Sequence, residues 1–315
     1  MENTIRMLQS RFQERGLQGR VVSVRHLQDL RDEIEGHHAQ GLLNEEFYKE
    51  ALSFFLFQDP ENLPHAASLI VVAVPQPQTK VSFAYNGNTQ TLILPPTYRG
   101  FRETTQQVQS LLTEWLAPDG YHVASARLPR KLLAVRSGLA EYGRNNIAYI
   151  PGMGSFFQPT VFFSDLPCPQ DTWHKSRMMD RCLDCHVCLT KCPTGAITAE
   201  RFLLRAERCL VFHNERSADH PFPDWIDPTV HHCLVGCMLC QQFCPEDKDF
   251  LNWFEGNETF AHEETALLLG GTSLNQLPTL TQEKLKRLDL LDYLGVLPRN
   301  LGVFFKTSGQ VRFMP

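Results

Sequence analysis

The sequence predicts a fold of the α/β (α+β) class in three successive parts. Strand-like and helix-like segments alternate through the first half of the chain, which is typical of a layered domain with a mixed sheet. All ten cysteines lie between Cys168 and Cys244, which indicates a compact module after that domain. Helix-like patterns follow the cysteines. We therefore expect an α/β domain over residues 1–165, a cysteine module over 166–250 and a short helical C-terminal extension over 251–315.

The spacing of apolar residues defines the expected elements. Residues 5–60 are expected to be helical, because apolar side chains recur at helical intervals among charged ones. Residues 69–74 are apolar, mostly β-branched and followed by Pro75, which predicts an interior strand. Later in the first domain we expect two helices, Thr104–Leu116 and Arg130–Val135, and two strands, Ile147–Ile150 and Thr160–Phe163. In the extension we expect helices over Glu263–Leu269 and Thr281–Leu294.

The composition is that of an ordinary globular protein. The 315 residues are 43% hydrophobic and 21% charged, which excludes wholesale disorder, collagen and coiled coil. Thirty basic and 35 acidic residues give a net charge of −5, so the chain is not built around a basic nucleic-acid surface. No apolar run approaches the roughly 18–20 residues of a membrane span, and the N-terminus lacks the pattern of a secretory signal. We expect a cytoplasmic protein with no membrane partner.

The cysteine spacing is the strongest motif in the chain. Cys182, Cys185, Cys188 and Cys192 follow one another at intervals of two, two and three residues, and Pro193 follows directly. This is the spacing of bacterial two-cluster ferredoxins, in which the fourth cysteine ligates the other cluster. A second run, Cys237, Cys240 and Cys244 with Pro245, resembles the first. The sequence therefore predicts two 4Fe–4S clusters.

The crossed pattern assigns the ligands of each cluster. Cluster one is expected to use Cys182, Cys185, Cys188 and Cys244, and cluster two to use Cys192, Cys237, Cys240 and one further cysteine. Spacing alone leaves Cys209 and Cys233 as alternatives for that last position. Two zinc sites are a rival interpretation, but structural zinc usually draws on separated pairs of cysteines. Cys168 stands apart and is expected to be a plain thiol.

Several segments together resemble the epoxyqueuosine reductase family, cobalamin-dependent iron–sulfur enzymes related to reductive dehalogenases. The strand Ser68–Val74 with Pro75, the glycine-marked segment from Ser137 to Asn146, the loop Gly154-Ser155-Phe156 and the two cysteine motifs carry the resemblance over roughly residues 65–250. The chain is expected to be a shortened, divergent member, because the residues after Pro245 are too few for the helical-repeat domain with which longer members hold tRNA.

The resemblance implies further roles. It favours Cys209 as the last ligand of cluster two, since a cysteine stands at the same interval in the family. It implies a corrinoid (cobalamin) held near the second cluster by Gly138, Tyr142, Gly143, Arg144, Asn145, Gly154 and Ser155. Glycines allow a ligand to approach the backbone closely, and the Arg144 and Asn145 side chains can donate hydrogen bonds to amides or a phosphate. Without the resemblance, these glycines are ordinary turns.

One family motif is missing. Members that reduce epoxyqueuosine carry Asp-Tyr-His after a Gly-Arg pair, and the Asp is taken as the proton donor. Here Gly100 is followed by Phe101, Arg102 and Glu103, so Glu103 is the candidate catalytic acid, provided that burial raises its pKa. The alternative is that Glu103 begins a solvated helix, where an acidic residue suits the helix dipole.

Two functions are consistent with these residues. The first is an oxidoreductase that passes single electrons through two clusters to a corrinoid, which reduces a small-molecule or tRNA-borne substrate. The second is an electron-transfer or corrinoid-reducing partner protein without substrate chemistry of its own. A flavin in place of the corrinoid is a third idea. Each function requires an external electron donor of the ferredoxin or flavodoxin type.

Overall fold

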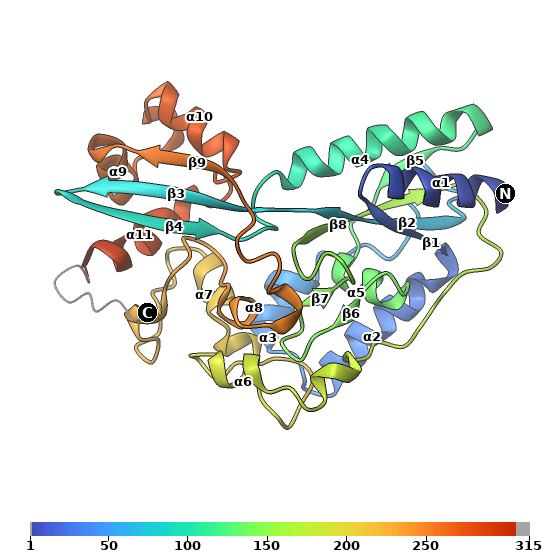
Figure 1. Ribbon diagram of the computed structural model, residues 1–315, viewed down its shortest axis with the longest axis horizontal. Coiled ribbons are helices and arrows are strands. Elements are labelled where there is room, and N and C mark those ends of the chain that lie inside the picture. Colours follow the sequence, from blue (N-terminus) through green and yellow to red (C-terminus); the bar gives the residue numbers. More distant parts are fainter. Residues whose placement is uncertain (1, 307–315) are drawn as a thin grey trace.

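The computed structural model describes residues 2–306, which form two β-sheets with helices packed on them (Figure 1). The first sheet has the strand order β1, β2, β8, β5, and every neighbouring pair in it is antiparallel. Its strands are β1 (Gln18–Ser23), β2 (Ser68–Pro75), β5 (Val123–Ser125) and β8 (Phe157–Ser164). A mixed sheet was expected here, and that detail was wrong. Helical periodicity between strands indicates a connection but not the direction in which the chain re-enters the sheet.

Helices cover both faces of the first sheet. α1 (Glu2–Glu14) and α4 (Phe101–Leu116) pack on one face, and α2 (Leu27–Ala39) and α5 (Arg130–Arg136) pack on the other (Figure 1). β2 lies between them, so Ile70 and Val72 enter one core while Leu69 and Val71 enter the other. Burial on both faces explains why this strand is a continuous apolar run rather than an alternating one.

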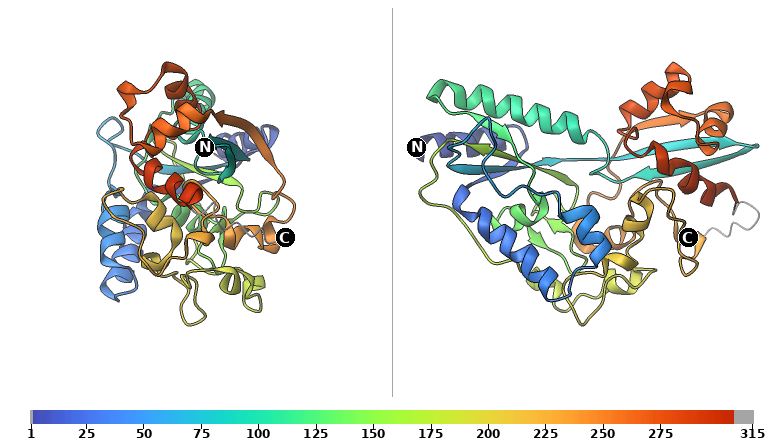
Figure 2. Two further views of the ribbon diagram at one scale, coloured as in Figure 1. Left: turned by 90° about the vertical axis from the view of Figure 1, so that its left-hand side faces the viewer. Right: turned by 180° about the vertical axis from the view of Figure 1, so that it is seen from behind.

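A second sheet lies at the end of the molecule opposite α1 (Figures 1 and 2). β3 (Gln78–Tyr85) pairs antiparallel with β4 (Asn88–Leu94) and parallel with β9 (Phe254–Phe260), so this sheet is mixed. Asn86 and Gly87 join β3 to β4 with φ of 48° and 76°, the positive values that a two-residue hairpin turn requires. The sequence analysis missed this sheet, although Asn-Gly is a strong hairpin signal.

The second sheet shares one core with the C-terminal helices. Val81, Phe83 and Leu94 pack with side chains of α9 (His262–Leu269), α10 (Thr279–Arg287) and α11 (Leu297–Lys306). The division of the chain at residues 165 and 250 stays a prediction, but a hairpin from the first segment thus belongs to the core of the last. The expected α/β class, with a double-cluster module and a helical C-terminal region, is confirmed.

Most expected elements are present with shifted bounds. α4, α5, α9, β2 and β8 match the ranges expected for them, and the expected strand 147–150 is the short β7 (Ala148–Tyr149), paired with β6 (Glu141–Tyr142). The helical stretch expected over 5–60 is interrupted by β1, and α3 (Glu45–Phe47) with the π-helical turn Tyr48–Leu52 follows α2. The helix expected over 281–294 ends at Arg287. No helix within residues 2–306 has the length and apolar character needed to span a membrane.

The cysteine module lies beneath both sheets in the view of Figure 1. Its helices are short: α6 (Val187–Lys191), α7 (Leu210–Glu215) and α8 (Leu239–Gln242). The cysteines lie in or beside these helices and the loops between them. The module is therefore held by its loops and by the sheets rather than by long helices of its own.

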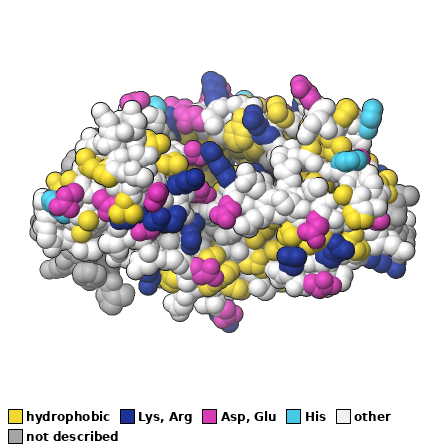
Figure 3. Space-filling model, turned by 90° about the horizontal axis from the view of Figure 1, so that it is seen from above, with side chains coloured by type: hydrophobic (Ala, Val, Ile, Leu, Met, Phe, Trp, Pro, Cys, Tyr) yellow, Lys and Arg dark blue, Asp and Glu magenta, His cyan; other side chains and the backbone are white. Residues whose placement is uncertain are grey.

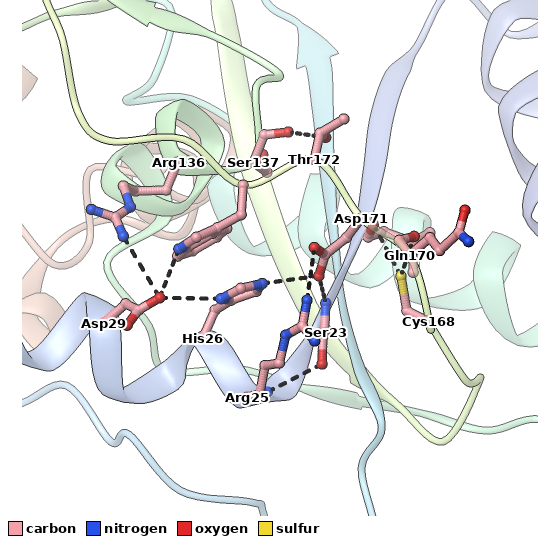
Figure 4. A network of polar contacts seen from close by, with 12 residues as sticks. Ser23, Arg25, His26, Asp29, Arg136, Ser137, Cys168, Gln170, Asp171 and Thr172 are labelled. Carbon is pink, nitrogen blue, oxygen red and sulfur yellow. Dashed lines mark hydrogen bonds and ion pairs between the residues drawn. The ribbon is translucent and has the colours of Figure 1, made fainter.

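A polar network fastens the segment that leads into the module (Figure 4). The side chain of Asp171, 3% exposed, accepts a hydrogen bond from the backbone N–H of Ser23 at 2.7 Å and lies 3.0 Å from Nε2 of His26. Asp29 lies 3.1 Å from Nδ1 of the same imidazole. Trp173 stacks on that ring, with centroids 4.1 Å apart, and donates to Asp29 at 2.8 Å. The segment is thereby fixed to the start of α2.

We expect Asp171→Ala to lower the free energy of unfolding by about 1–3 kcal/mol, because it leaves the backbone N–H of Ser23 and Nε2 of the buried His26 without their acceptor. Chemical denaturation of the reconstituted protein measures this. The exposed Asp59→Ala is the control and is expected to stay within about 0.5 kcal/mol of the parent chain. Equal losses in both variants would contradict the role of the network.

Candidate iron–sulfur site

One small cavity brings together thiols from both cysteine motifs. Its lining includes Cys182, Cys185 and Cys188 from the first motif and Cys244 from the second. Burial raises the pKa of Cys188 to about 11, and the neighbouring thiols Cys182, Cys244 and Cys185 add to the rise. The four cysteines predicted to bind cluster one therefore surround one space. These donors fit a thiolate-ligated cluster, whose binding must displace the thiol protons.

A second group of thiols lies deeper. Burial raises the pKa of Cys237 to about 12, and the thiols of Cys209 and Cys192 contribute. Burial also raises the pKa of Cys240 well above its ordinary value, with Cys237, Cys209, Cys188 and Cys192 adding to the effect. Cys192, Cys209, Cys237 and Cys240 are thus mutual neighbours. They are the set that the crossed pattern and the family resemblance predicted for cluster two.

Cys233 has a different environment from these four. It is 2% exposed and packs with Phe156 and Met238 in a small apolar core, and its backbone pairs with Ile93. Among the other cysteines, only Cys237 contributes to the rise in its pKa, which burial dominates. The structure therefore places Cys209, not Cys233, in the second group. Cys168 is a buried thiol whose Sγ lies 3.4 Å from the carbonyl oxygen of Val21 (Figure 4).

Arg144 and Asn145 hold the cysteine loops. The Arg144 guanidinium donates to three carbonyls of the first loop, those of Cys185 at 3.1 Å, Cys182 at 2.7 Å and Leu183 at 3.1 Å. Asn145 donates to the hydroxyl of Tyr149 at 2.8 Å. Gly143 packs closely on Tyr149, because a Cβ at this position would come within 2.6 Å of the tyrosine ring. This segment therefore positions the first cysteine loop.

Gly154 and Ser155 form a second anchor. The Ser155 N–H and hydroxyl each donate to the fully buried carboxylate of Asp247 at 2.7 Å, and Gln241 donates to the Ser155 hydroxyl at 2.8 Å. Burial raises the pKa of Asp247 to about 6, although the two hydrogen bonds from Ser155 oppose that rise. Asp247 lies just after Cys244 and Pro245, so this contact holds the end of the second cysteine motif against the first domain.

Two glycines offer a test of this anchor. Both Gly154 and Gly152 have positive φ, 56° and 80°. A Cβ at Gly154 would press on Asp247 and approach the Glu246 carbonyl oxygen to 2.9 Å, whereas a Cβ at Gly152 meets nothing within 4 Å. We expect Gly152→Ala to cost about 1–2 kcal/mol of stability through backbone strain. Gly154→Ala is expected to cost about 1–3 kcal/mol more through overpacking. Thermal and chemical unfolding compare them, and equal losses would show that the close contact is unimportant.

The residues expected to cradle a corrinoid have protein partners. Besides the contacts of Gly143, Arg144, Asn145, Gly154 and Ser155, Gly138 lies against His174, to which a Cβ would approach within 3.0 Å, and Tyr142 is buried against Phe202. A cavity of about 1030 Å³ between α1, β1 and the Gly152–Met153 loop is lined by none of them. These seven residues do not form an open binding site for a corrinoid in this structure. Their hydrogen-bond donors and close contacts are made to other protein residues, largely of the cysteine module.

Glu103 is exposed on the first turn of α4, where Gln107 donates to its carboxylate at 3.2 Å. The structure therefore lacks the burial on which its predicted role as an acid depended. Its position agrees with the alternative, a solvated helix start, because negative charge in the first turn suits the dipole.

Sequence reasoning gave no role to the neighbouring cations Arg130 and Lys131, of which Lys131 lies beside the second group of thiols. Burial lowers the pKa of Lys131, while the thiols of Cys209 and Cys240 act in the opposite direction. Arg130 stacks over the ring of Phe101 at 4.2 Å, and its buried Nη1 atom makes no hydrogen bond to another described residue. Two adjacent basic residues directly after Pro129 are visible in the sequence and could have indicated a positive charge near the site. The Lys131 side chain provides positive charge close to the site predicted for cluster two.

Comparisons with known proteins agree with this architecture. A family described as a 4Fe-4S double cluster binding domain matches residues 181–247. An epoxyqueuosine reductase of Staphylococcus aureus is 25% identical over 230 residues, which cover 70% of this chain and 58% of the relative. An epoxyqueuosine reductase of a Synechococcus species is 33% identical over 123 residues, which cover 39% of this chain and 36% of that one. The chain is a relative of the epoxyqueuosine reductases.

Solved structures support the same relationship at the level of the fold. The epoxyqueuosine reductase from Streptococcus thermophilus matches with a TM-score of 0.68 and 17% identity over 96% of this chain and 81% of that one. An epoxyqueuosine reductase solved with a modified tRNA stem loop matches with a TM-score of 0.61 and 18% identity, covering 91% and 76% of the two chains. The resemblance carried by the sequence motifs is thereby confirmed. The chain spans about half the length of the curated epoxyqueuosine reductases that it matches.

Proposed function

We propose that this protein is an iron–sulfur oxidoreductase that binds two 4Fe–4S clusters and transfers single electrons through them. The observation that carries the proposal is the crossed grouping of the thiols, with Cys244 beside the first motif and Cys192 beside the second. This is the arrangement of two-cluster ferredoxins. Cys182, Cys185, Cys188 and Cys244 would hold cluster one, and Cys192, Cys209, Cys237 and Cys240 cluster two. When bound, these clusters supply one-electron reduction.

Electrons enter at the side of cluster one. Leu183, within the first cysteine loop, is 59% exposed, and Phe243, next to Cys244, is 46% exposed. Cluster two lies deeper, where burial raises the pKa of Cys240 well above its usual range. An external donor of the ferredoxin or flavodoxin type would therefore dock over Leu183 and Phe243, and the acceptor would lie beyond cluster two, near Lys131.

The names of the relatives indicate which substrate to test first. They are named for epoxyqueuosine, and one was solved with a tRNA stem loop, so a tRNA-borne epoxide is the first substrate to test. Removal of an epoxide oxygen as water requires two electrons and two protons. The clusters would deliver the electrons one at a time, and the protons would come from the solvent. Basic and acidic side chains are interspersed on the face seen in Figure 3, so a tRNA would meet single cations there rather than a broad basic surface.

The corrinoid that the resemblance implies has a weaker basis in the described residues. Its seven expected contacts serve the cysteine module, and Glu103 is exposed, so no step of the proposed function is assigned to a corrinoid. These two observations favour a second candidate, an electron-transfer protein that reduces a corrinoid or another acceptor held by a partner. Such a protein needs neither a cradle nor a proton donor.

Anaerobic reconstitution with iron, sulfide and hydroxocobalamin tests the proposal and separates the candidates. About eight irons per chain are expected for two 4Fe–4S clusters. One corrinoid retained through gel filtration, with turnover of an epoxyqueuosine-containing tRNA, would support the reductase. Eight irons without corrinoid or turnover would support the electron-transfer protein. Zinc in place of iron would overturn both candidates.

A further inference from the structure

Thr194 places a buried hydroxyl beside one of the cysteines expected to bind cluster two. Its Oγ1 atom lies 3.6 Å from Sγ of Cys192, and the residue is 6% exposed. Sulfur is a larger atom than oxygen or nitrogen, so its hydrogen bonds are longer. Within the part of the chain that the structure describes, this hydroxyl makes no other hydrogen bond. Buried hydroxyls are nearly always hydrogen-bonded, so the sulfur of Cys192 is the partner that satisfies Thr194.

The backbone holds this hydroxyl in place. The carbonyl oxygen of Thr194 accepts a hydrogen bond from Nε of Arg208 at 2.8 Å. The next residue, Gly195, donates its N–H to the carbonyl oxygen of Cys192 at 3.4 Å and has a φ of 63°, which glycine adopts without strain. Threonine is also β-branched, which restricts rotation about χ1. The hydroxyl therefore has little freedom to move away from the sulfur.

Metal ligation would fix the direction of this hydrogen bond. In the free chain either group can donate, because a thiol and a hydroxyl each carry a proton. Cysteine binds a metal as the thiolate, which has no proton. In the protein loaded with clusters, the hydroxyl of Thr194 is therefore the donor and Sγ of Cys192 is the acceptor.

The two cysteine motifs differ at this position. In both, the N–H three residues after the last cysteine donates to the carbonyl oxygen of that cysteine, at 3.4 Å in the first motif and 3.0 Å in the second. The residue that follows the proline in this turn is Thr194 in the first motif and Glu246 in the second. Glu246 pairs with Arg181 at 2.9 Å, and an ionised carboxylate has no proton to donate. The turn after Cys244 therefore lacks the donor that the turn after Cys192 has.

We propose that Thr194 is a positioning residue that raises the reduction potential of cluster two by donating a hydrogen bond to Sγ of Cys192. Hydrogen bonds to ligating sulfurs are one of the factors that set cluster potentials. Reduction adds negative charge to the cluster and its thiolates, so a donor stabilises the reduced form more than the oxidised form. A higher potential at cluster two favours the transfer of electrons to it from cluster one. This inference rests on the proposed ligation of cluster two by Cys192.

The test is an EPR-monitored redox titration of the anaerobically reconstituted full chain. Thr194→Val keeps the branched side chain and removes the hydroxyl, whereas Thr194→Ser keeps the hydroxyl. We expect Thr194→Val to make reduction of cluster two about tenfold less favourable, which is about 59 mV for a one-electron couple. Thr194→Ser is expected to keep the parent potential. An unchanged potential in Thr194→Val, or an equal shift in both variants, would overturn the inference.

Chains that hold one cluster identify which cluster responds. The chain with Cys182→Ala and Cys244→Ala is expected to keep cluster two, and the chain with Cys209→Ala is expected to keep cluster one. Thr194→Val should lower the potential in the first chain and leave it unchanged in the second. A shift in the chain that keeps cluster one would contradict a hydrogen bond specific to cluster two.

The iron content of the unsubstituted chain separates this inference from the proposed function. It is measured first, and a chain that assembles no clusters would overturn the proposed function itself. About eight irons per chain with no change of potential in Thr194→Val would leave the proposed function standing and overturn the role of Thr194 alone.

Discussion

Cys209→Ala is expected to lose one whole cluster, whereas Cys233→Ala keeps both. Cys209 neighbours Cys192 and Cys237, and its removal leaves cluster two with three protein ligands. Cys233 packs among apolar side chains, and its removal costs only packing. After anaerobic reconstitution we expect about four irons per chain for Cys209→Ala and about eight for Cys233→Ala.

The Cys233→Ala variant is the matched control, since it removes the same side chain from a nearby buried position. Loss of iron in Cys233→Ala with full iron in Cys209→Ala would reverse the assignment. Each variant is compared after gel filtration, so that iron bound loosely to unfolded chain is not counted.

Double substitutions are expected to separate crossed from sequential ligation. Cys182 and Cys244 belong to different motifs but line the same cavity, so Cys182→Ala with Cys244→Ala removes ligands from one cluster only. Cys182 and Cys192 belong to one motif but to different groups, so their joint replacement damages both clusters. We expect about four irons per chain in the first double variant and almost none in the second.

Iron analysis and the visible absorption of the clusters provide the measurement. If each motif held its own cluster, the pattern would be reversed, and the pair from one motif would retain about four irons. The single variants Cys182→Ala and Cys244→Ala serve as controls, and each is expected to retain about four irons, as the Cys182→Ala, Cys244→Ala double variant does.

The metal module was predictable because its information is local. Intervals of two and three residues on a tight loop determine which thiols share a cluster, and the groups in the structure follow that spacing. The choice between Cys209 and Cys233 was not local, because both stand at plausible intervals. Their neighbours separate them: Cys209 lies near other thiols of the second group, whereas Cys233 packs with Phe156 and its backbone pairs with Ile93, which are distant from it in sequence.

The corrinoid cradle shows the opposite case. Gly143, Arg144 and Gly154 stood out because glycine and arginine were recognisable in a motif, and the motif suggested a ligand. In the structure the same residues allow close contact between protein segments, with Arg144 bonded to three carbonyls of the first cysteine loop. A glycine that admits a ligand and one that admits another loop look alike in a sequence. The second sheet was missed because its strands are largely polar and β9 lies far from β3 along the chain.

The pairing of β3 with β9 has a consequence for biosynthesis. Phe83, made early, stacks on Phe260, made late, with ring centroids 5.0 Å apart, and the whole cysteine module lies between them in the sequence. Contacts of such high sequence separation form slowly, because the entropy cost of closing a long loop comes before the stabilising contact is made. During synthesis, the hairpin of β3 and β4 lacks β9 and the C-terminal helices that complete its core until every cysteine has been synthesised. The second sheet therefore closes only after the whole cysteine module has been synthesised.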